Sequence, residues 1–198
     1  MTITPLDYLP LAEENEGNIP WMYLDTRGNV TVGIGHLLAS AADAAELPFV
    51  DRKSGVVVAE TQIRADFNVV QDAQRWVGKP ARAFRKMTKL DLPYDATVEL
   101  FSKDFDRILR RTRAVFRAVG GSFDGYREPA QLAVLDMAFN LGPDGLYREF
   151  KTFRNKGLEF RDYITAAMES HRRGISEERN ARTRNLLLQA SRMELRHR

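Results

Sequence analysis

Two carboxylates nine residues apart, Glu16 and Asp25, are the residues of this sequence that are best placed to do chemistry. The sequence predicts that Glu16 ends a helix and that Asp25 stands at the bend of a β-hairpin. Residues 26–29 are typical of a turn, and β-branched or aromatic residues flank them. Two carboxylates in these places can face each other across a gap, which is the arrangement that enzymes use to hydrolyse glycosidic bonds.

The residues around this pair keep a fixed spacing. A glutamate is followed by glycine, an aspartate comes after eight intervening residues, a threonine after five more, and the segment closes with Gly-x-Gly-His. The positions of the pattern are Glu16, Asp25, Thr31, Gly33, Gly35 and His36. This segment resembles the catalytic signature of the phage-type lysozymes, glycoside hydrolase family 24. The resemblance includes residues 100–104, at the start of a long helix, and residues 133–142, in a later helix. With the hairpin and these two helices it covers about two thirds of the chain.

The resemblance implies a role for three of these residues. Glu16 is the general acid, which needs a carboxyl group that is still protonated near the working pH through partial burial or a nearby negative charge. Asp25 is the general base that activates a water molecule on the opposite face of the sugar, so the implied reaction inverts the anomeric configuration. The hydroxyl of Thr31 helps to hold that water.

Taken without the resemblance, each residue also has an ordinary structural interpretation. Glu16 could be a surface carboxylate, as we interpret Glu13 and Glu14 to be. Asp25 suits a turn because aspartate accepts hydrogen bonds from the backbone N–H groups that follow it. Thr31 is a favoured strand residue. The common register of the three residues favours catalysis.

His36 is predicted to be structural. The sequence has three histidines, the others being His171 and His197 in distant segments, and no His, Cys or carboxylate cluster has metal-ligand spacing. We therefore expect no metal and no cofactor. In the family, the matching histidine pairs with an acidic residue of the long helix, and Asp104 aligns with that residue. The resemblance implies a structural ion pair between His36 and Asp104.

Three further residues are predicted to contact the substrate. The family places an arginine of its C-terminal helices near the catalytic glutamate, and a guanidinium there would orient the glutamate or bind substrate. Arg182 fits that position best, with Arg179 and Arg184 as alternatives and a solvated helix face as the structural alternative. Asn140 is a polar residue on an otherwise apolar helix. Tyr23 can stack on a sugar ring, although burial beside the hairpin is the simpler role.

The composition is that of a globular protein. The chain has 198 residues, of which 43% are hydrophobic and 29% charged, so it can bury a core and suits a single domain. It has no cysteine, which excludes disulfide and thiol chemistry. It has no apolar run long enough to span a membrane, and no secretory signal is visible at its N-terminus.

Charge is unevenly distributed along the chain. Residues 1–99 carry a net charge of −4 and residues 100–198 a net charge of +7. A basic half can attract nucleic acid, acidic lipid or an anionic cell-wall polymer. Five arginines lie within residues 107–117, but no nucleic-acid-binding motif is present and the apolar stripe of this segment is committed to packing. We therefore expect no nucleic-acid partner.

The hydrophobic pattern predicts an α+β fold that is mainly helical. We expect one lysozyme-like domain over residues 1–198, with an N-terminal helix in 1–15 and an N-lobe in 16–92 that holds a small β-hairpin or sheet. A long helix in 93–119 joins it to a helical C-lobe in 120–198. The two-lobe arrangement comes from the resemblance, from which residues 41–92 depart.

Helices are expected in residues 5–15, 61–77, 95–119, 130–141, 160–168 and from 176 onward. In the long helix, Asp95 is the expected N-cap and Gly120-Gly121 the expected stop. Pro129 suits the first turn of the next helix. A short strand is expected at residues 56–58.

The function that these residues favour is that of an N-acetylmuramidase. The substrate, the β-1,4 bond between N-acetylmuramic acid and N-acetylglucosamine in peptidoglycan, comes from the resemblance. The alternative is a catalytically silent peptidoglycan-binding or toxin-delivery module. We expect a monomer that is made in the cytoplasm and acts on the cell wall, in the periplasm of a target or host cell, as an endolysin, a bacteriocin or a secreted effector. An effector would have an immunity protein or delivery machinery as a partner.

Overall fold

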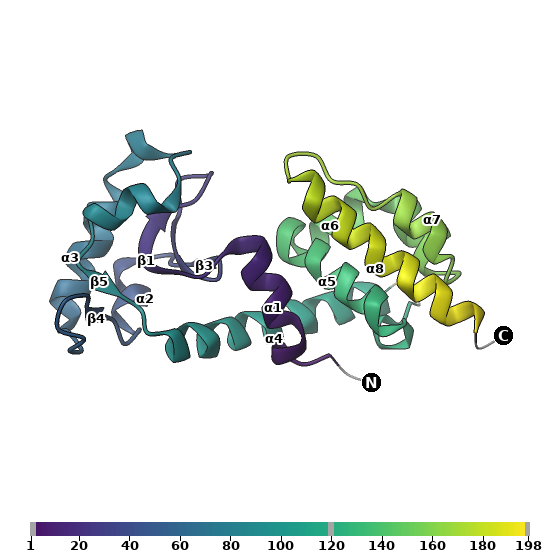
Figure 1. Cartoon of the computed structure of the whole chain (residues 1–198), viewed down its shortest axis with the longest axis horizontal. Coiled ribbons are helices and arrows are strands. Elements are labelled where there is room, and N and C mark those ends of the chain that lie inside the picture. Colours follow the sequence, from purple (N-terminus) through teal and green to yellow (C-terminus); the bar gives the residue numbers. More distant parts are fainter. Residues whose placement is uncertain (1–2, 119–120, 197–198) are drawn as a thin grey trace. The chain divides into compact units, whose positions relative to one another are not determined.

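The computed structural model describes residues 3–118 and 121–196 and has an α+β fold that is mainly helical, with a small antiparallel sheet. The predicted fold class is confirmed at this level. The chain divides into two compact units. The sheet unit is formed by Ala12–Asp104, and the helical unit by Met1–Leu11 with Phe105–Arg198. Figure 1 labels most of the helices and strands of both.

The sheet unit is built on one three-stranded antiparallel sheet. Its strands, in spatial order, are β1 (Ile19–Leu24), β2 (Val30–Gly33) and β3 (His36–Leu37). Leu24 pairs with Val30 across the turn, so the predicted hairpin is present. Gly28 in this turn has a φ of +83°, a left-handed conformation that a side chain would strain.

The helix α1 (Pro5–Glu16) leads into this sheet, and Glu16 is its last residue, as predicted. The helix ends because Gly17 turns to a φ of +72°, and its N–H donates to the carbonyl of Glu13 at 2.9 Å. The glycine therefore fixes the point at which the chain leaves the helix beside Glu16.

The segment between the hairpin and the long helix differs in part from the prediction. Its regular elements are α2 (Ala41–Ala45), β4 (Val50–Asp51), α3 (Glu60–Gln71) and β5 (Leu90–Asp91). Short 3-10 turns follow α3 at Gln74–Trp76 and Ala81–Lys86. The strand predicted at residues 56–58 is wrong, because Val56 and Val57 are exposed and a single bridge joins Val57 to Val50. The strand is instead β4, which pairs with β5.

The helix predicted at residues 61–77 begins earlier and ends sooner. Ala59 is its N-cap, and the side chain of Gln62 accepts the N–H of Ala59 at 3.2 Å. The helix ends at Gln71, whose carbonyl accepts the side-chain amide of Gln74 at 2.8 Å. A side chain thus takes the place of the next helical N–H and lets the chain turn.

The apolar core of the sheet unit lies between its sheet and α3. Its most deeply buried members are Met22, Val32, Phe49, Phe67, Val70, Phe84 and Leu92. Trp21 of β1 is also buried, and its indole N–H donates to the carbonyl of Ala81 at 2.9 Å. This tryptophan therefore anchors the hairpin to the segment after α3.

The longest helix, α4 (Tyr94–Arg117), contains the boundary between the two units. It begins one residue before Asp95, so Asp95 lies in the first turn and is not the N-cap that the sequence predicted. Val119 and Gly120, which belong to the predicted end of this helix, lie outside the described residues, as does His197.

The helical unit contains α5 (Glu128–Leu141), α6 (Pro143–Glu149), the π-helical segment η4 (Phe153–Leu158), α7 (Tyr163–Met168) and α8 (Glu177–Leu195). In this unit, α5 packs against α6 and α8, and α7 packs against α8 and η4. Pro129 lies in the first turn of α5, as predicted. The helix predicted at residues 160–168 starts later, because Asp162 caps it by accepting the N–H of Thr165 at 3.0 Å. α6 and η4 were not predicted.

Gly157 allows η4 to pack directly against α7. A Cβ at this position would lie 2.7 Å from the Cβ and 2.8 Å from the backbone nitrogen of Ala166. Because backbone cannot move aside as the end of a flexible side chain can, Gly157→Ala is expected to lower the free energy of unfolding by about 1–3 kcal/mol. Urea denaturation measures this. Gly145→Ala is the matched control, since its Cβ would meet a side chain at an ordinary 3.6 Å. Equal effects of the two substitutions would contradict the prediction.

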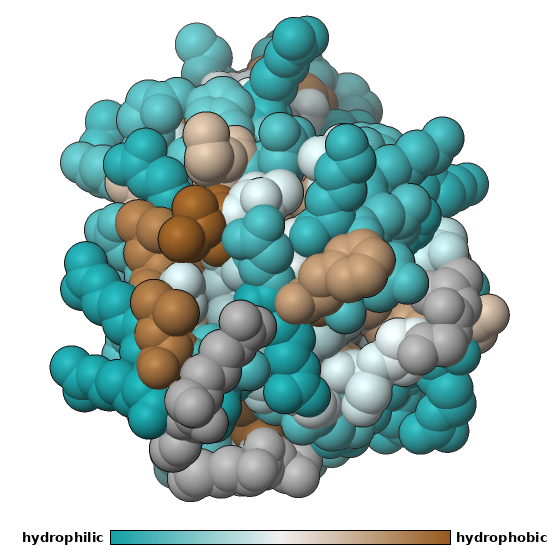
Figure 2. All heavy atoms as spheres, turned by 90° about the vertical axis from the view of Figure 1, so that its right-hand side faces the viewer, coloured by the Kyte–Doolittle hydropathy of each residue, from teal (hydrophilic) through white to brown (hydrophobic). Residues whose placement is uncertain are grey.

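Some large apolar side chains of the helical unit are exposed, namely Phe160, Ile164, Met168 and Leu195. Figure 2 shows apolar atoms gathered in a few patches on a face that is otherwise hydrophilic. Within residues 3–118 and 121–196, no helix combines the length and the apolar character that crossing a membrane requires.

Candidate active site

Three hydrogen bonds hold the Asp25 carboxylate at the hairpin bend. Its Oδ1 accepts the backbone N–H groups of Arg27 and Asn29, each at 2.8 Å, and its Oδ2 accepts the side-chain amide of Asn29 at 3.0 Å. The N–H of Asp25 donates to the carbonyl of Asn29 at 2.9 Å and closes the turn. The turn therefore fixes the direction in which this carboxylate points.

The same contacts keep Asp25 ionised. Partial burial raises the pKa of Asp25, but the hydrogen bonds from Asn29 and Arg27 outweigh it, and the pKa falls below its usual range. A carboxylate of this kind is charged at neutral pH and can orient and polarise a water molecule, whereas it cannot donate a proton. The structural and the catalytic interpretations of Asp25 are therefore compatible, because the turn supplies the charged form that a base needs.

Glu16 lies at the C-terminal end of α1, beside the loop between β2 and β3. A Cβ built on Gly35 would be 3.8 Å from the Cγ and from Oε2 of Glu16, an ordinary contact, so Gly35 lies directly beside the carboxyl group. The φ of +71° at this position is what favours glycine. Glu16 is exposed. The partial burial expected from the sequence is therefore not provided by the protein, because the side chain projects from the last residue of a helix.

Tyr23 of β1 joins the two carboxylates into one electrostatic site. Burial, together with the negative charges of Glu16 and Asp25, raises the pKa of Tyr23 to about 12. Both carboxylates must lie within electrostatic reach of the phenol for this to hold. Tyr23 is half-buried, so its ring is in part covered by the hairpin and in part open to a ligand.

Thr31 lies in β2 directly opposite Tyr23 in the strand register. It is buried, and its hydroxyl donates to the carbonyl of Asn29 at 3.2 Å. The hydroxyl oxygen retains lone pairs that can accept a hydrogen bond from water. The hairpin thus brings Glu16, Tyr23, Asp25 and Thr31 into one unit of the chain.

His36 and Asp104 form the ion pair that the resemblance implied. Nδ1 of His36 lies 2.6 Å from Oδ2 of Asp104, with side chains that are 23% and 16% exposed. His36 begins β3, so the contact ties the third strand of the sheet to α4. This placement supports a structural role for the pair.

Asp104→Asn is expected to lower the free energy of unfolding by about 1–3 kcal/mol, because it removes the negative charge from the partly buried partner of His36. The activity of the protein that remains folded should be unchanged. Chemical denaturation measures the first effect, and the specific activity at a temperature well below the unfolding transition measures the second. A large loss of specific activity in a folded variant would show that the pair has more than a structural role.

Asn140 and Arg182 belong to the helical unit, whereas the carboxylates belong to the sheet unit. Both side chains are half-buried, Asn140 near the end of α5 and Arg182 within α8. Of the alternatives to Arg182, Arg184 is exposed, but Arg179 is buried and paired with Asp136. Arg182 stays as the predicted substrate contact, with Arg179 and Arg184 as the alternatives.

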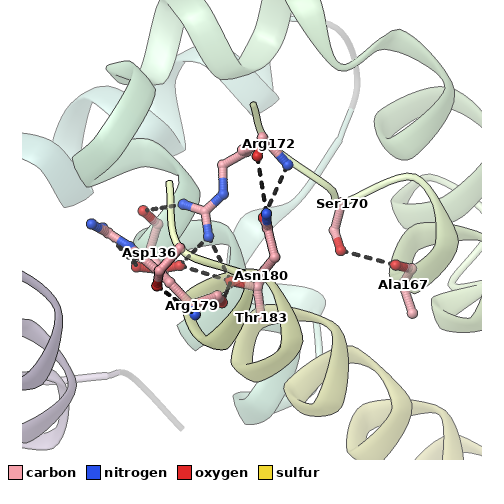
Figure 3. A network of polar contacts seen from close by, with 8 residues as sticks. Asp136, Ala167, Ser170, Arg172, Arg179, Asn180 and Thr183 are labelled. Atoms are coloured by element: carbon pink, nitrogen blue, oxygen red, sulfur yellow. Dashed lines mark hydrogen bonds and ion pairs between the residues drawn. The ribbon is translucent and has the colours of Figure 1, made fainter. Parts of the chain in front are cut away.

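A buried ionic network in the helical unit was not predicted. Asp136 of α5 binds two guanidinium groups, with its Oδ2 at 2.5 Å from Nη2 of Arg172 and its Oδ1 at 3.0 Å from Nε of Arg179. The hydroxyl of Thr183 donates to the same carboxylate at 2.8 Å. Figure 3 shows these groups converging on Asp136, with Asn180 bonded to the backbone of Arg172. All of these residues are buried, so the network is internal support for α5 and α8.

The basic face of α4 is in part neutralised by neighbouring carboxylates. Arg111 forms a bidentate pair with Asp144, at 2.5 and 2.9 Å, and Arg113 pairs with Asp124 at 2.7 Å. Guanidinium groups engaged in this way are less able to bind phosphates. Two of the five arginines of α4 are therefore engaged with carboxylates of the helical unit.

Among residues 3–118 and 121–196, no group of three or more His, Cys, Asp or Glu side chains is arranged to hold a metal ion. No protein-family model matches the chain, and a search of curated proteins finds no match. The assignment of a function therefore depends on the sequence pattern of residues 16–36 and on the geometry of the hairpin that carries it.

Proposed function

We propose that this protein is a peptidoglycan hydrolase, an N-acetylmuramidase that cleaves the β-1,4 bond between N-acetylmuramic acid and N-acetylglucosamine and so lyses bacterial cell walls. The observation that carries the proposal is the hairpin itself. It holds the carboxylate of Asp25 in its ionised form at the turn. The carboxylate of Glu16, at the end of α1, acts electrostatically on the phenol of Tyr23, as that of Asp25 does. The proposal includes the two-lobe fold of the phage-type lysozymes.

Glu16 acts as the general acid. It protonates the glycosidic oxygen as the bond to the leaving sugar breaks. Because Glu16 is exposed in the free protein, partial burial of its carboxyl group would have to come from the bound glycan. Exposure also leaves the carboxyl group accessible to a long polymer.

Asp25 acts as the general base on the opposite face of the sugar. Its fixed, ionised carboxylate orients a water molecule, removes a proton from it and directs it at the anomeric carbon. The hydroxyl of Thr31 holds the same water. Arg182 and Asn140 bind the glycan, and Tyr23 packs against a sugar ring.

Displacement by water in one step inverts the anomeric carbon, so a β-linked substrate is expected to give an α-configured product first. Proton NMR of a soluble peptidoglycan oligosaccharide within the first minutes of digestion distinguishes this from retention, because mutarotation has not yet mixed the anomers. An initial β product would reassign Asp25 as a nucleophile.

The experiment that tests the proposed function compares binding with release. Purified, insoluble peptidoglycan is incubated with the protein, and both the bound protein and the soluble reducing ends are measured over time. The proposal predicts binding and a steady rise in reducing ends. Binding without release would favour the alternative, a catalytically silent binding or toxin-delivery module.

The setting in which the enzyme works is also a proposal. An endolysin, a bacteriocin and an effector delivered into the periplasm of another bacterium would all act on the cell wall, and the last two would be neutralised by an immunity protein. The basic half of the chain, residues 100–198, would favour binding to the anionic wall polymer.

A further inference from the structure

The helical unit contains a pocket that none of the proposed catalytic residues lines. It has a volume of about 300 Å³, at the lower end of the range for small-ligand sites. Three aromatic rings and three polar side chains line it together with Gly121: Phe116, Tyr126, Tyr147, Arg154, Asn155 and Glu159. A few polar groups among aromatic walls are typical of ligand sites rather than of packing defects.

The π-helical segment η4 places the charged residues of this pocket. The N–H of Glu159 donates to the carbonyl of Arg154 at 2.9 Å, a bond that spans five residues instead of four. This wider turn places Glu159 one turn after Arg154, on the same wall of the pocket. In an α-helix the apolar Leu158 would lie closer to the place that Glu159 takes. π-helical turns are rare and often occur at functional sites.

The backbone just after η4 is also unusual. Arg161 has a φ of +56°, a left-handed conformation that non-glycine residues seldom adopt. Residues held in such conformations cluster at ligand-binding and catalytic sites. Two uncommon backbone features therefore flank the pocket within a few residues of each other.

The Arg154 side chain is held in place before any ligand binds. Its guanidinium carbon lies 3.7 Å from the centre of the Tyr147 ring, Nη1 donates to the carbonyl of Tyr147 at 2.5 Å, and Nε donates to Oδ1 of Asn155 at 2.6 Å. These contacts use two of its three nitrogens and leave Nη2 able to donate to an anion. A guanidinium held in this way is suited to a carboxylate.

Glu159 supplies the opposite charge. Within the described part of the chain, no ion pair joins it to Arg154 although both line the same pocket. Burial raises the pKa of Tyr126, and the negative charge of Glu159 also raises it. The Tyr126 ring packs edge-on against Phe116, with ring centroids 6.0 Å apart. The pocket thus presents a cation and an anion on one wall and an apolar floor of aromatic rings.

We propose that this pocket binds a free, zwitterionic dipeptide, with its carboxylate on Arg154, its ammonium group on Glu159 and an apolar side chain against Phe116 and Tyr126. The two charged residues are one helical turn apart, roughly 5 Å along the axis, which suits a dipeptide of about 3.5 Å per residue better than one amino acid. The proposal does not depend on the proposed hydrolase activity.

The test is an NMR titration of the isotope-labelled full chain with the dipeptide Ala-Leu. Backbone resonances of residues 153–159 are expected to shift. N-acetyl-Ala-Leu, which lacks the ammonium group, and Ala-Leu amide, which lacks the carboxylate, should each bind about tenfold more weakly or worse, because each loses one charge-assisted hydrogen bond. N-acetylglucosamine serves as an uncharged probe of the same pocket.

Substitutions assign the effect to the two charges. Arg154→Gln and Glu159→Gln should each weaken Ala-Leu binding about tenfold. Lys156→Gln is the matched control, because Lys156 is exposed on the same segment and does not line the pocket, and it should leave binding unchanged. If a variant fails to fold, the titrations of the unaltered protein with N-acetyl-Ala-Leu and Ala-Leu amide still test the proposal. Equal binding of blocked and free dipeptides, binding of the sugar alone, or no shift at millimolar dipeptide would overturn the proposal.

Discussion

Glu16→Gln is expected to lower the rate of peptidoglycan hydrolysis by about 10²–10⁴-fold, the usual contribution of a positioned general acid. Glutamine has the size and shape of glutamate, but its amide cannot deliver a proton to the leaving oxygen. Because Glu16 is exposed at the end of a helix, the substitution should leave the fold and the binding of glycan intact. The release of soluble reducing ends, measured at saturating substrate, gives the loss of rate.

The matched control is Glu14→Gln, which makes the same change of charge on the same helix at another exposed glutamate. It should keep nearly the full rate. A similar loss in both variants would mean that the effect comes from surface charge and not from acid catalysis. A full rate in Glu16→Gln would remove Glu16 from the mechanism.

Asp136→Ala is expected to lower the free energy of unfolding by about 3–5 kcal/mol, the cost of removing one partner from a buried ionic network. The substitution leaves the guanidinium groups of Arg172 and Arg179 in the interior without the carboxylate that compensates their charge. It also removes one acceptor of the Thr183 hydroxyl, which keeps the carbonyl of Arg179 as another. Urea denaturation followed by circular dichroism measures the loss.

Asp144→Ala is the control for that experiment, because it breaks an ion pair with Arg111 in which both side chains are about half exposed. Exposed pairs of this kind contribute about 0–1 kcal/mol. A loss in Asp136→Ala no larger than in Asp144→Ala would mean that the buried arginines find other partners or that water reaches them. The comparison therefore separates the effect of burying an ion pair on the free energy of unfolding from the effect of losing one carboxylate charge.

The hairpin and the helix before it could be predicted because the residues that define them are close in sequence. The turn of residues 26–29, the glycine after Glu16 and the spacing to Thr31 are local signals. The start of α5 followed from Pro129 for the same reason. The ion pair between His36 and Asp104 spans 68 positions and was expected only because the resemblance implied it.

The buried network could not be predicted, because its partners are far apart in sequence. Asp136 meets Arg172 across 36 positions and Thr183 across 47. The one signal in the sequence was Asp136, a carboxylate in the middle of a largely apolar helix. It indicates that a partner exists but not where that partner lies. Among several arginines in the C-terminal segment, only the fold decides that Arg179 turns inward.

The π-helical segment was missed for another reason. Residues 153–158 have no distinct periodicity, and the wider turn depends on the close approach of Gly157 to Ala166 in a later helix. The strand at residues 56–58 was wrong because three consecutive valines have strand propensity, while tertiary contacts leave Val56 and Val57 in solvent. In both cases packing with distant residues decided the local structure.

The most direct test of the central claim is the chemistry of the products. Purified peptidoglycan is digested with the unaltered protein and with Glu16→Gln, the soluble fragments are reduced with borohydride, and mass spectrometry identifies the reduced sugar. The account predicts fragments that end in reduced N-acetylmuramic acid from the unaltered protein and almost none from the variant. Fragments from both proteins at equal rate, or fragments that end in reduced N-acetylglucosamine, would contradict it.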